Sequence, residues 1–248
     1  VIIVGGCGYN ADEFAGIFHG LGVETTLIYR GSLFLRGFDR DLRLVLTEEM
    51  EKKGINIIFG SHIEQIGKQG NSLIATLEEG EQLEAGQIMY ATGRKPLTAN
   101  LGLENVGIEL NVNGAIKVND QYQTNVSSIY AIGDVTDRVN LTPVALAEGM
   151  VLARRLYDKQ NGAVDYNDIP TCVFSQPNLG TVGLTEEEAR KQYKDIDIYK
   201  STFTPMKYSL SDSNEKTFMK LIVDKASDRV VGVHMIGPDA GEIIQGIG

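Results

Sequence analysis

The chain has 248 residues, 42% of them apolar, which is enough for one large or two to three small domains with a sizeable core. A net charge of −10 argues against a nucleic-acid partner, and no run approaches the roughly 20 apolar residues of a membrane helix, so no membrane partner is expected either. Cys7 and Cys172 lack C-x-x-C or metal spacing and the three histidines lie far apart, so we predict no disulphide framework, no metal site and a reducing, cytoplasmic location.

The first thirty residues predict a strand, a glycine turn, a helix and a second strand. Residues 1–4 are an apolar run that stops at glycines, residues 14–21 carry apolar side chains at helical spacing, and residues 23–29 alternate as a strand does. The turn between the first strand and the helix matches the pattern G-x-G-x-x-A, and its residues are Gly6, Cys7, Gly8, Tyr9, Asn10 and Ala11.

This turn predicts a dinucleotide site. The first glycine allows a tight turn, the second lets a pyrophosphate approach the backbone, and Ala11 keeps the helix close to the strand. The unpaired N–H groups of the helix then face the phosphates. Glycines also occupy ordinary strand-to-helix turns, but the strand before this turn and the helix after it favour nucleotide binding.

The end of the second predicted strand indicates which dinucleotide is bound. An acid there suits the ribose 2′-hydroxyl of NAD, whereas an arginine suits the 2′-phosphate of NADP. The sequence has Arg30 at this position and Arg36 six residues later. Two guanidinium groups can share one phosphate through charge-assisted hydrogen bonds, so we predict NADP(H). The alternative is a pair of solvated surface arginines.

The remaining elements up to Gly93 complete a nucleotide-binding domain. A helix is expected to start at Asp39, a suitable N-cap, and a strand follows at 55–59. Short alternating runs then predict a small antiparallel meander, and residues 88–91 form another buried strand. The expected fold class is α/β, with a Rossmann-like domain in residues 1–93 that combines a parallel sheet with the meander.

Residues 94–165 are rich in loops and contain a candidate ligand-binding acid. A buried strand predicted at 129–132 ends on Gly133-Asp134, where an acid can accept a hydrogen bond from a ligand's hydroxyl chain. A helix-capping or turn aspartate is an equally good interpretation. Thr142-Pro143 then starts a helix with proline in its first turn.

The chain changes character in residues 166–248. We expect an α+β domain with a mostly antiparallel sheet there, and a helix that starts at Thr185. The predicted strands lie near 172–174, 180–184, 196–203, 217–224 and 229–236. The sequence of this part shows no paired acids, metal-ligand cluster or nucleophile–base set.

Taken together, the motifs resemble those of the pyridine nucleotide-disulphide oxidoreductases, and within that family the glutathione reductases, over essentially the whole chain. The segments that carry the resemblance are residues 6–15, Arg30 with Arg36, and residues 91–96, 124–134 and 169–174. The resemblance implies an NADPH-binding domain at 1–93, the C-terminal part of an FAD-binding domain at 94–165, and part of a dimerisation domain at 166–248 of a homodimer.

Roles for individual residues are implied by the same resemblance. Tyr9 would cover the nicotinamide pocket, although a turn aromatic that packs on the sheet is the alternative. Glu13 would pair with a flavin-adjacent lysine that this chain lacks. The other implied cofactor contacts are Gly93 for NADP(H) and Gly133, Asp134, Leu141 and Thr142 for FAD.

Some features depart from the family pattern. The sequence lacks the C-x-x-x-x-C redox pair, the N-terminal glycine turn for FAD and the C-terminal His-Pro-Thr segment, so we expect no catalytic residue in this chain and expect it to be cut from a longer one. Cys7 fills a variable position. Asn10 and Asp12 are unusual, and an acid near the bound phosphates leads to the hypothesis that these two residues weaken cofactor binding.

The resemblance implies that the parent protein passes hydride from NADPH to FAD, and electrons from there to a cysteine pair and a disulphide, with glutathione disulphide as the first choice. Related reductases remain open: dihydrolipoamide dehydrogenase, against which Arg30 argues, mercuric reductase and trypanothione-type reductases. The alternative from another class is a non-catalytic nucleotide-binding module.

Overall fold

The computed structural model describes residues 2–4, as backbone only, and residues 9–248. The chain divides into two compact units, one made of Val1–Gly93 with Asn167–Gly248 and the other of Arg94–Tyr166. The predicted α/β fold class is confirmed. The division into three functional domains stays a prediction.

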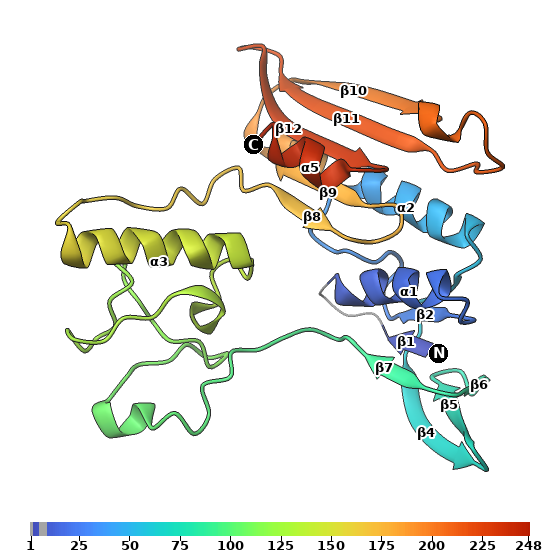
Figure 1. Cartoon of the computed structure of the whole chain (residues 1–248), viewed down its shortest axis with the longest axis horizontal. Helices are drawn as coiled ribbons and strands as arrows, with labels where there is room; N and C mark the ends of the chain where they lie inside the picture. Colours follow the sequence, from blue (N-terminus) through green and yellow to red (C-terminus); the bar gives the residue numbers. More distant parts are fainter. Residues whose placement is uncertain (1, 5–8) are drawn as a thin grey trace. The chain divides into compact units, whose positions relative to one another are not determined.

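The first unit contains a parallel sheet in the order β3-β2-β1-β7, of which Figure 1 labels β1, β2 and β7. Its strands are β1 (Ile2–Val4), β2 (Thr26–Tyr29), β3 (Asn56–Phe59) and β7 (Ile88–Tyr90). From β1 the chain passes through helix α1 (Asn10–Gly20) to β2 on one side, whereas β7 lies on the other side. The strand order therefore reverses at β1. At such a reversal, ligands bind beyond the carboxyl ends of the strands, and α1 follows the carboxyl end of β1.

A second helix and a small meander complete this part of the unit. Helix α2 (Arg40–Lys52) starts as predicted, with Asp39 as its N-cap, because the Asp39 side chain accepts a hydrogen bond from the backbone N–H of Asp41. The predicted meander is an antiparallel sheet of β4 (Ile63–Gln69), β5 (Ser72–Leu77) and β6 (Gln82–Ala85).

The C-terminal part of the same unit is a five-stranded antiparallel sheet in the order β10-β11-β12-β9-β8 (Figure 1). Its strands are β8 (Thr171–Val173), β9 (Leu179–Gly183), β10 (Ile196–Phe203), β11 (Thr217–Asp224) and β12 (Arg229–Ile236). Its helices are α4 (Glu186–Gln192), α5 (Ala240–Gln245) and the short η3 (Met206–Tyr208). The α+β character predicted for this part is confirmed.

Apolar packing explains why residues 1–93 and 167–248 form one unit. A single cluster of buried side chains contains Leu42, Leu46 and Met50 of α2 together with Leu179 of β9 and Ile236 of β12. Each of these five residues is 0% exposed, so α2 packs tightly against the antiparallel sheet. Burial of this kind stabilises a fold by roughly 1.5–3 kcal/mol for each large side chain.

A buried charge cluster joins the same two parts. The ammonium of Lys220, on β11, lies 2.8 Å from Asp39, 2.6 Å from Asp41 and 2.7 Å from Glu186, and its side chain is 1% exposed. Desolvation lowers the pKa of Lys220, but hydrogen bonds to the carboxylates outweigh it and raise this pKa above its ordinary value. Lys220 therefore stays charged and connects α2 with α4 and β11.

The second unit contains helix α3 (Thr142–Tyr157) and two short 3-10 helices, η1 (Leu103–Val106) and η2 (Gly133–Thr136). The strand predicted at 129–132 is not formed, and only an isolated bridge joins Tyr130 to Gln123. Two backbone hydrogen bonds join this segment to residues 122–124, and a third joins the N–H of Ile129 to the carbonyl of Val126 within the same turn. These bonds do not build a ladder.

Candidate functional site

The candidate dinucleotide site begins at the N-terminus of α1. Gly6, Cys7 and Gly8 lie outside the described residues. Tyr9 is the N-cap of α1 and makes no side-chain capping hydrogen bond, and Asn10 is the first helical residue. Ala11 is 1% exposed in the core, which agrees with the close helix–strand packing expected of it. Within the described part of the chain, no side chain caps the first N–H groups of α1, so these groups can face an anion.

The α-helices differ in how their N-termini are capped. The Asp39 side chain caps α2, and Thr185 with Glu188 forms a capping box on α4. Among the described residues, no side chain caps α1, α3 or the short α5. Two of these three helices, α1 and α3, follow the Gly6–Ala11 turn and the Gly133-Asp134 segment, where the sequence predicts cofactor phosphates and flavin.

Asp12, on the first turn of α1, is buried instead of solvated. Its side chain is 2% exposed, and its Oδ1 has no hydrogen-bond partner among the described residues. Desolvation, with a smaller contribution from Glu13, raises its pKa from 3.8 to about 8. At neutral pH the carboxyl is therefore mostly uncharged, so charge repulsion of phosphates is not a sufficient basis for the hypothesis of weaker cofactor binding.

Tyr9 and Glu13 contact other parts of the first unit. The Tyr9 ring meets Phe38 edge-on, with ring centres 6.0 Å apart. Glu13 Oε1 accepts a hydrogen bond of 2.9 Å from the backbone N–H of Phe174, a residue just after β8. The second contact ties α1 to the antiparallel sheet. The expected roles of Tyr9 over a nicotinamide and of Glu13 beside a lysine stay predictions.

Arg30 and Arg36 lie on one loop, residues 30–38, between β2 and α2. Both arginines are exposed, whereas Phe34 and Leu35 between them are 2% and 3% exposed. Gly31 is required at the start of the loop because a Cβ there would lie 2.7 Å from the ring of Tyr29. The loop thus has a buried apolar side, and its two cations lie at the surface.

Gly93 ends the first unit in a conformation that suits glycine. Its φ of +122° lies in a region that residues with a Cβ rarely adopt, and no atom lies within 4 Å of a Cβ built there. The backbone at Gly93 is therefore open to approach. Contact with NADP stays a prediction for this residue.

The residues predicted to contact flavin lie in the second unit. Gly133 is buried with a φ of +69°, and Asp134 follows it as an exposed residue on η2. Leu141 has extended backbone and precedes α3, whose first turn holds Thr142 and a proline. The helix N-terminus therefore lies close in sequence to the glycine–acid pair, as expected.

A cavity of about 350 Å³ in the second unit includes Asp134 in its lining. The other lining residues are Arg94, Lys95, Pro96, Leu97, Val135 and Asn140. The sequence had indicated residues 91–96 as a motif but had not marked Arg94, Lys95 or Asn140 as candidate contacts. Two cations and one acid around a single cavity suit a polar, negatively charged ligand group.

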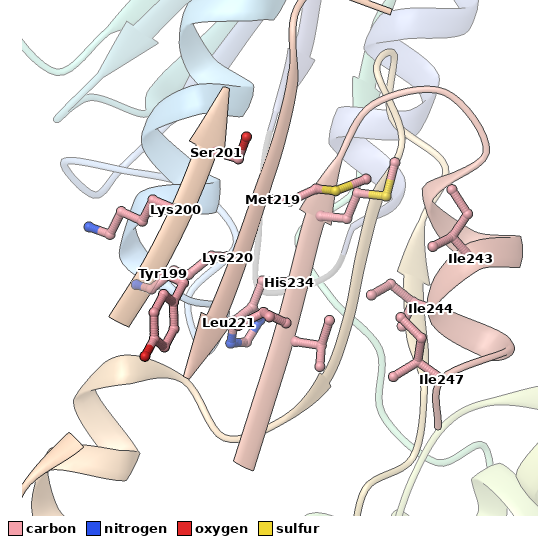
Figure 2. A pocket seen from close by; sticks show the side chains of 12 residues that line it. Tyr199, Lys200, Ser201, Met219, Lys220, Leu221, His234, Ile243, Ile244 and Ile247 are labelled. Carbon is pink, nitrogen blue, oxygen red and sulfur yellow. The ribbon is translucent and has the colours of Figure 1, made fainter. Parts of the chain in front are cut away.

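A second, apolar cavity of about 300 Å³ lies between the antiparallel sheet and the α5 segment (Figure 2). His234 is among its lining residues, but the His234 ring is engaged by the Thr181 hydroxyl at 2.6 Å and the Leu184 carbonyl at 3.0 Å. Burial lowers the pKa of His234, so the ring is neutral at physiological pH. We assign no chemistry to this cavity.

The described residues contain neither a metal-ligating cluster nor a helix that could span a membrane. No group of three or more histidine, cysteine, aspartate or glutamate side chains among residues 9–248 is arranged to hold a metal ion. None of the helices in the described part of the chain is long and apolar enough to cross a membrane.

Comparison with known proteins identifies the family. A sequence profile described as pyridine nucleotide-disulphide oxidoreductase matches residues 1–149, and a profile for the dimerisation domain of that family matches residues 169–248. The glutathione reductase of Burkholderia cepacia is 46% identical over 247 residues, which cover 100% of this chain and 55% of that protein. The chloroplastic/mitochondrial glutathione reductase of Pisum sativum is 48% identical over 247 residues, which cover 99% of this chain and 45% of that protein.

Two other similarities point the same way. The trypanothione reductase of Trypanosoma congolense is 42% identical over 253 residues, covering 100% of this chain and 51% of that protein. The solved structure of the HOCl-induced flavoprotein disulfide reductase RclA from Escherichia coli has a TM-score of 0.89 and 30% identity, and the match covers 99% of this chain and 57% of that one. The chain spans about half the length of the curated relatives it matches.

These matches confirm the family predicted from the motifs, and with it FAD and NADP(H) as the family's cofactors. The profile matches cover both the nucleotide-binding elements and the antiparallel sheet. The chain belongs to the pyridine nucleotide-disulphide oxidoreductase family.

Proposed function

We propose that this chain is the NADPH-binding and dimerisation part of a flavoprotein that reduces glutathione disulphide. The observation that carries the NADPH assignment is the loop at 30–38, which leaves Arg30 and Arg36 exposed at both ends of a buried apolar segment. The glutathione reductases among the relatives support the substrate, and the trypanothione reductase is the second candidate.

The residues present fit a phosphorylated dinucleotide. In this proposal the uncapped N-terminus of α1 receives the pyrophosphate, and Arg30 with Arg36 holds the 2′-phosphate. Tyr9 lies at the start of α1 and covers the nicotinamide side. Gly93, where the backbone is open, passes beside the dinucleotide.

The residues of the second unit fit part of a flavin site. In this proposal Asp134 would accept a hydrogen bond from the ribityl chain, and Arg94 and Lys95 on the same cavity would hold anionic groups. The uncapped N-terminus of α3 at Thr142 would stabilise negative charge on the flavin ring. Bound FAD supplies the two-electron relay between a nicotinamide and a disulphide.

We assign no residue of this chain to the reduction of the disulphide itself. The sequence contains only Cys7 and Cys172, which do not form a C-x-x-x-x-C pair. In our proposal the redox cysteines and the acid–base pair belong to further segments of the full-length protein. The match of residues 169–248 to a dimerisation profile supports a homodimer, and the cysteine spacing supports the cytoplasm as its compartment.

The test uses the full-length protein with glutathione disulphide and either NADPH or NADH. We expect a bound flavin spectrum and a preference for NADPH of at least about a hundredfold, since two charge-assisted bonds contribute about 1.5–3 kcal/mol each. The double variant Arg30→Ala, Arg36→Ala is expected to lose most of that preference, whereas Arg40→Ala, which removes an exposed cation at the start of α2, retains it. Equal use of NADH, or turnover of another disulphide only, would overturn the assignment.

A further inference from the structure

The loop at 30–38 carries both arginines of the proposed phosphate site, so its shape decides where they point. Leu35, halfway along it, has a φ of +54°, which is an unfavourable conformation for a residue with a Cβ. A segment of this kind keeps one conformation only when its surroundings hold it. Burial of Phe34, whose ring lies 5.7 Å from that of Phe59, provides one such restraint.

The second restraint comes from Arg43, on the first turn of α2. Its Nε donates a hydrogen bond of 2.6 Å to the carbonyl of Phe34, and its Nη2 donates another to the carbonyl of Leu33. One planar guanidinium thus bonds to two consecutive carbonyls of the loop, which a lysine ammonium cannot reproduce with the same geometry.

The guanidinium of Arg43 serves the backbone and not a carboxylate. None of the ion pairs among the described residues involves Arg43. Partial burial lowers its pKa, while Tyr29 and Glu187 act in the opposite direction, and an arginine so shifted remains protonated at physiological pH. Its two donors are therefore permanently available to the loop.

The helix that carries Arg43 is itself fixed. The backbone N–H of Arg43 bonds to the carbonyl of Asp39, and the Asp39 side chain is held by the buried ammonium of Lys220. A rigid helix end, a bidentate contact and a buried phenyl ring together define the course of the backbone between Arg30 and Arg36.

We propose that Arg43 is a positioning residue for coenzyme selection, which holds the loop so that Arg30 and Arg36 converge on the 2′-phosphate. This inference rests on the proposed function, because it presumes that the two arginines bind that phosphate. Arg43 itself makes no contact with the coenzyme. Loss of Arg43 therefore weakens the binding of ligands that carry a 2′-phosphate and leaves the binding of other ligands unchanged.

The experiment compares Arg43→Met and Arg43→Lys in the full-length flavoprotein by calorimetric titration with adenosine 2′,5′-bisphosphate and with adenosine 5′-monophosphate. We expect Arg43→Met to raise the Kd of the bisphosphate by about tenfold or more, as the loss of one charge-assisted bond does. We expect the Kd of the monophosphate and the flavin spectrum to stay unchanged. For Arg43→Lys we expect a Kd of the bisphosphate between the values of the wild type and of Arg43→Met. The matched control is Arg40→Met, an exposed arginine on the same turn, which leaves both affinities as they are.

Several results would decide against the proposal. An equal loss for both nucleotides would mean that Arg43 supports the fold in general, and an unchanged Kd for the bisphosphate would mean that the loop does not need it. If Arg43→Met fails to fold, the ratio of the two affinities in Arg43→Lys decides in the same way. A wild-type protein that does not prefer the bisphosphate would overturn the proposed function, and the inference with it, whereas a preference that survives in Arg43→Met overturns the inference alone.

Discussion

Glu148 Oε2 accepts a 2.6 Å hydrogen bond from the backbone N–H of Gly133, fifteen residues earlier in the chain. The other carboxylate oxygen, Oε1, accepts a hydrogen bond of 2.6 Å from the hydroxyl of Tyr166. Glu148 is 1% exposed, and both oxygens are used. A buried carboxylate on α3 therefore fixes the turn that presents Asp134.

The first prediction concerns this contact. Glu148→Ala leaves the Gly133 N–H and the Tyr166 hydroxyl without their partner, which we expect to lower the free energy of unfolding by about 1–3 kcal/mol for each group. We also expect the full-length protein to bind less flavin, measured as the ratio of visible to protein absorbance after gel filtration. The control Tyr166→Phe removes the bonds of the Tyr166 hydroxyl to Glu148, Tyr122 and Arg138 and leaves the Gly133 N–H paired with Glu148. A full flavin content in Glu148→Ala would show that the placement of Asp134 for flavin binding does not depend on the contact between Glu148 and Gly133.

Asp12 leads to a prediction about pH. Its pKa is raised from 3.8 in the unfolded chain to about 8 in the folded protein, chiefly by desolvation. Between these values the native state keeps a proton that the unfolded state has lost, so stability falls as the pH rises across that window, by up to about 1.4 kcal/mol per pH unit. The loss is complete above about pH 8 and absent below the unfolded pKa.

Urea unfolding of the full-length protein and of Asp12→Asn at pH 6 and pH 8 measures this effect. The asparagine does not titrate, so the variant is expected to gain stability relative to wild type as the pH rises. Parallel pH profiles would show that Asp12 ionises normally. NADPH titration of Asn10→Ile with Asp12→Val in the full-length protein tests the hypothesis that Asn10 and Asp12 weaken cofactor binding, and unchanged affinity would end it.

Lys220 leads to a third prediction. Lys220→Met removes the cation that pairs with the buried Asp39, whereas Asp41 keeps its ion pair with Lys200 and Glu186 keeps its ion pair with Arg190. Breaking a buried pair such as Lys220–Asp39 costs about 3–5 kcal/mol. The control is Lys225→Met, because Lys225 pairs with Asp197 at the surface, with side chains 62% and 40% exposed. A surface pair of this kind contributes about 0–1 kcal/mol. Similar melting temperatures for the two variants would contradict the role assigned to Lys220.

These residues show where reasoning from the sequence stops. The caps at Asp39 and Thr185 and the strands of the antiparallel sheet were predictable because their signals are local. Lys220 was not, because its partner Asp39 lies 181 residues away. The sequence predicts Asp12 as a charge near the phosphates. The segment after β8 also covers α1, however, because a Cβ built on Gly16 of this helix would lie 3.4 Å from Gln176.

The strand expected at 129–132 failed for a related reason. An apolar run ending on Gly133-Asp134 is typical of a buried strand, but a strand also needs neighbours along its whole length, and here pairing stops after residues 122–124. Arg43 and Glu148 gave no sequence signal at all. Each bonds to backbone atoms, and backbone atoms carry no residue identity that a motif could reveal.

The last prediction is that these 248 residues alone do not reduce glutathione disulphide. Thiolate is the reactive form of cysteine, and burial, with smaller contributions from Glu13 and Glu242, raises the pKa of Cys172 to about 11. At pH 7.5 the thiol is therefore almost wholly protonated, and Cys7 lies too far along the sequence to form the expected redox pair. NADPH consumption in the presence of glutathione disulphide, followed at 340 nm, is expected to equal that of a Cys172→Ser control. Steady consumption that disappears in Cys172→Ser would assign redox chemistry to this thiol and contradict the proposal that the reactive cysteines lie in other segments of the full-length protein.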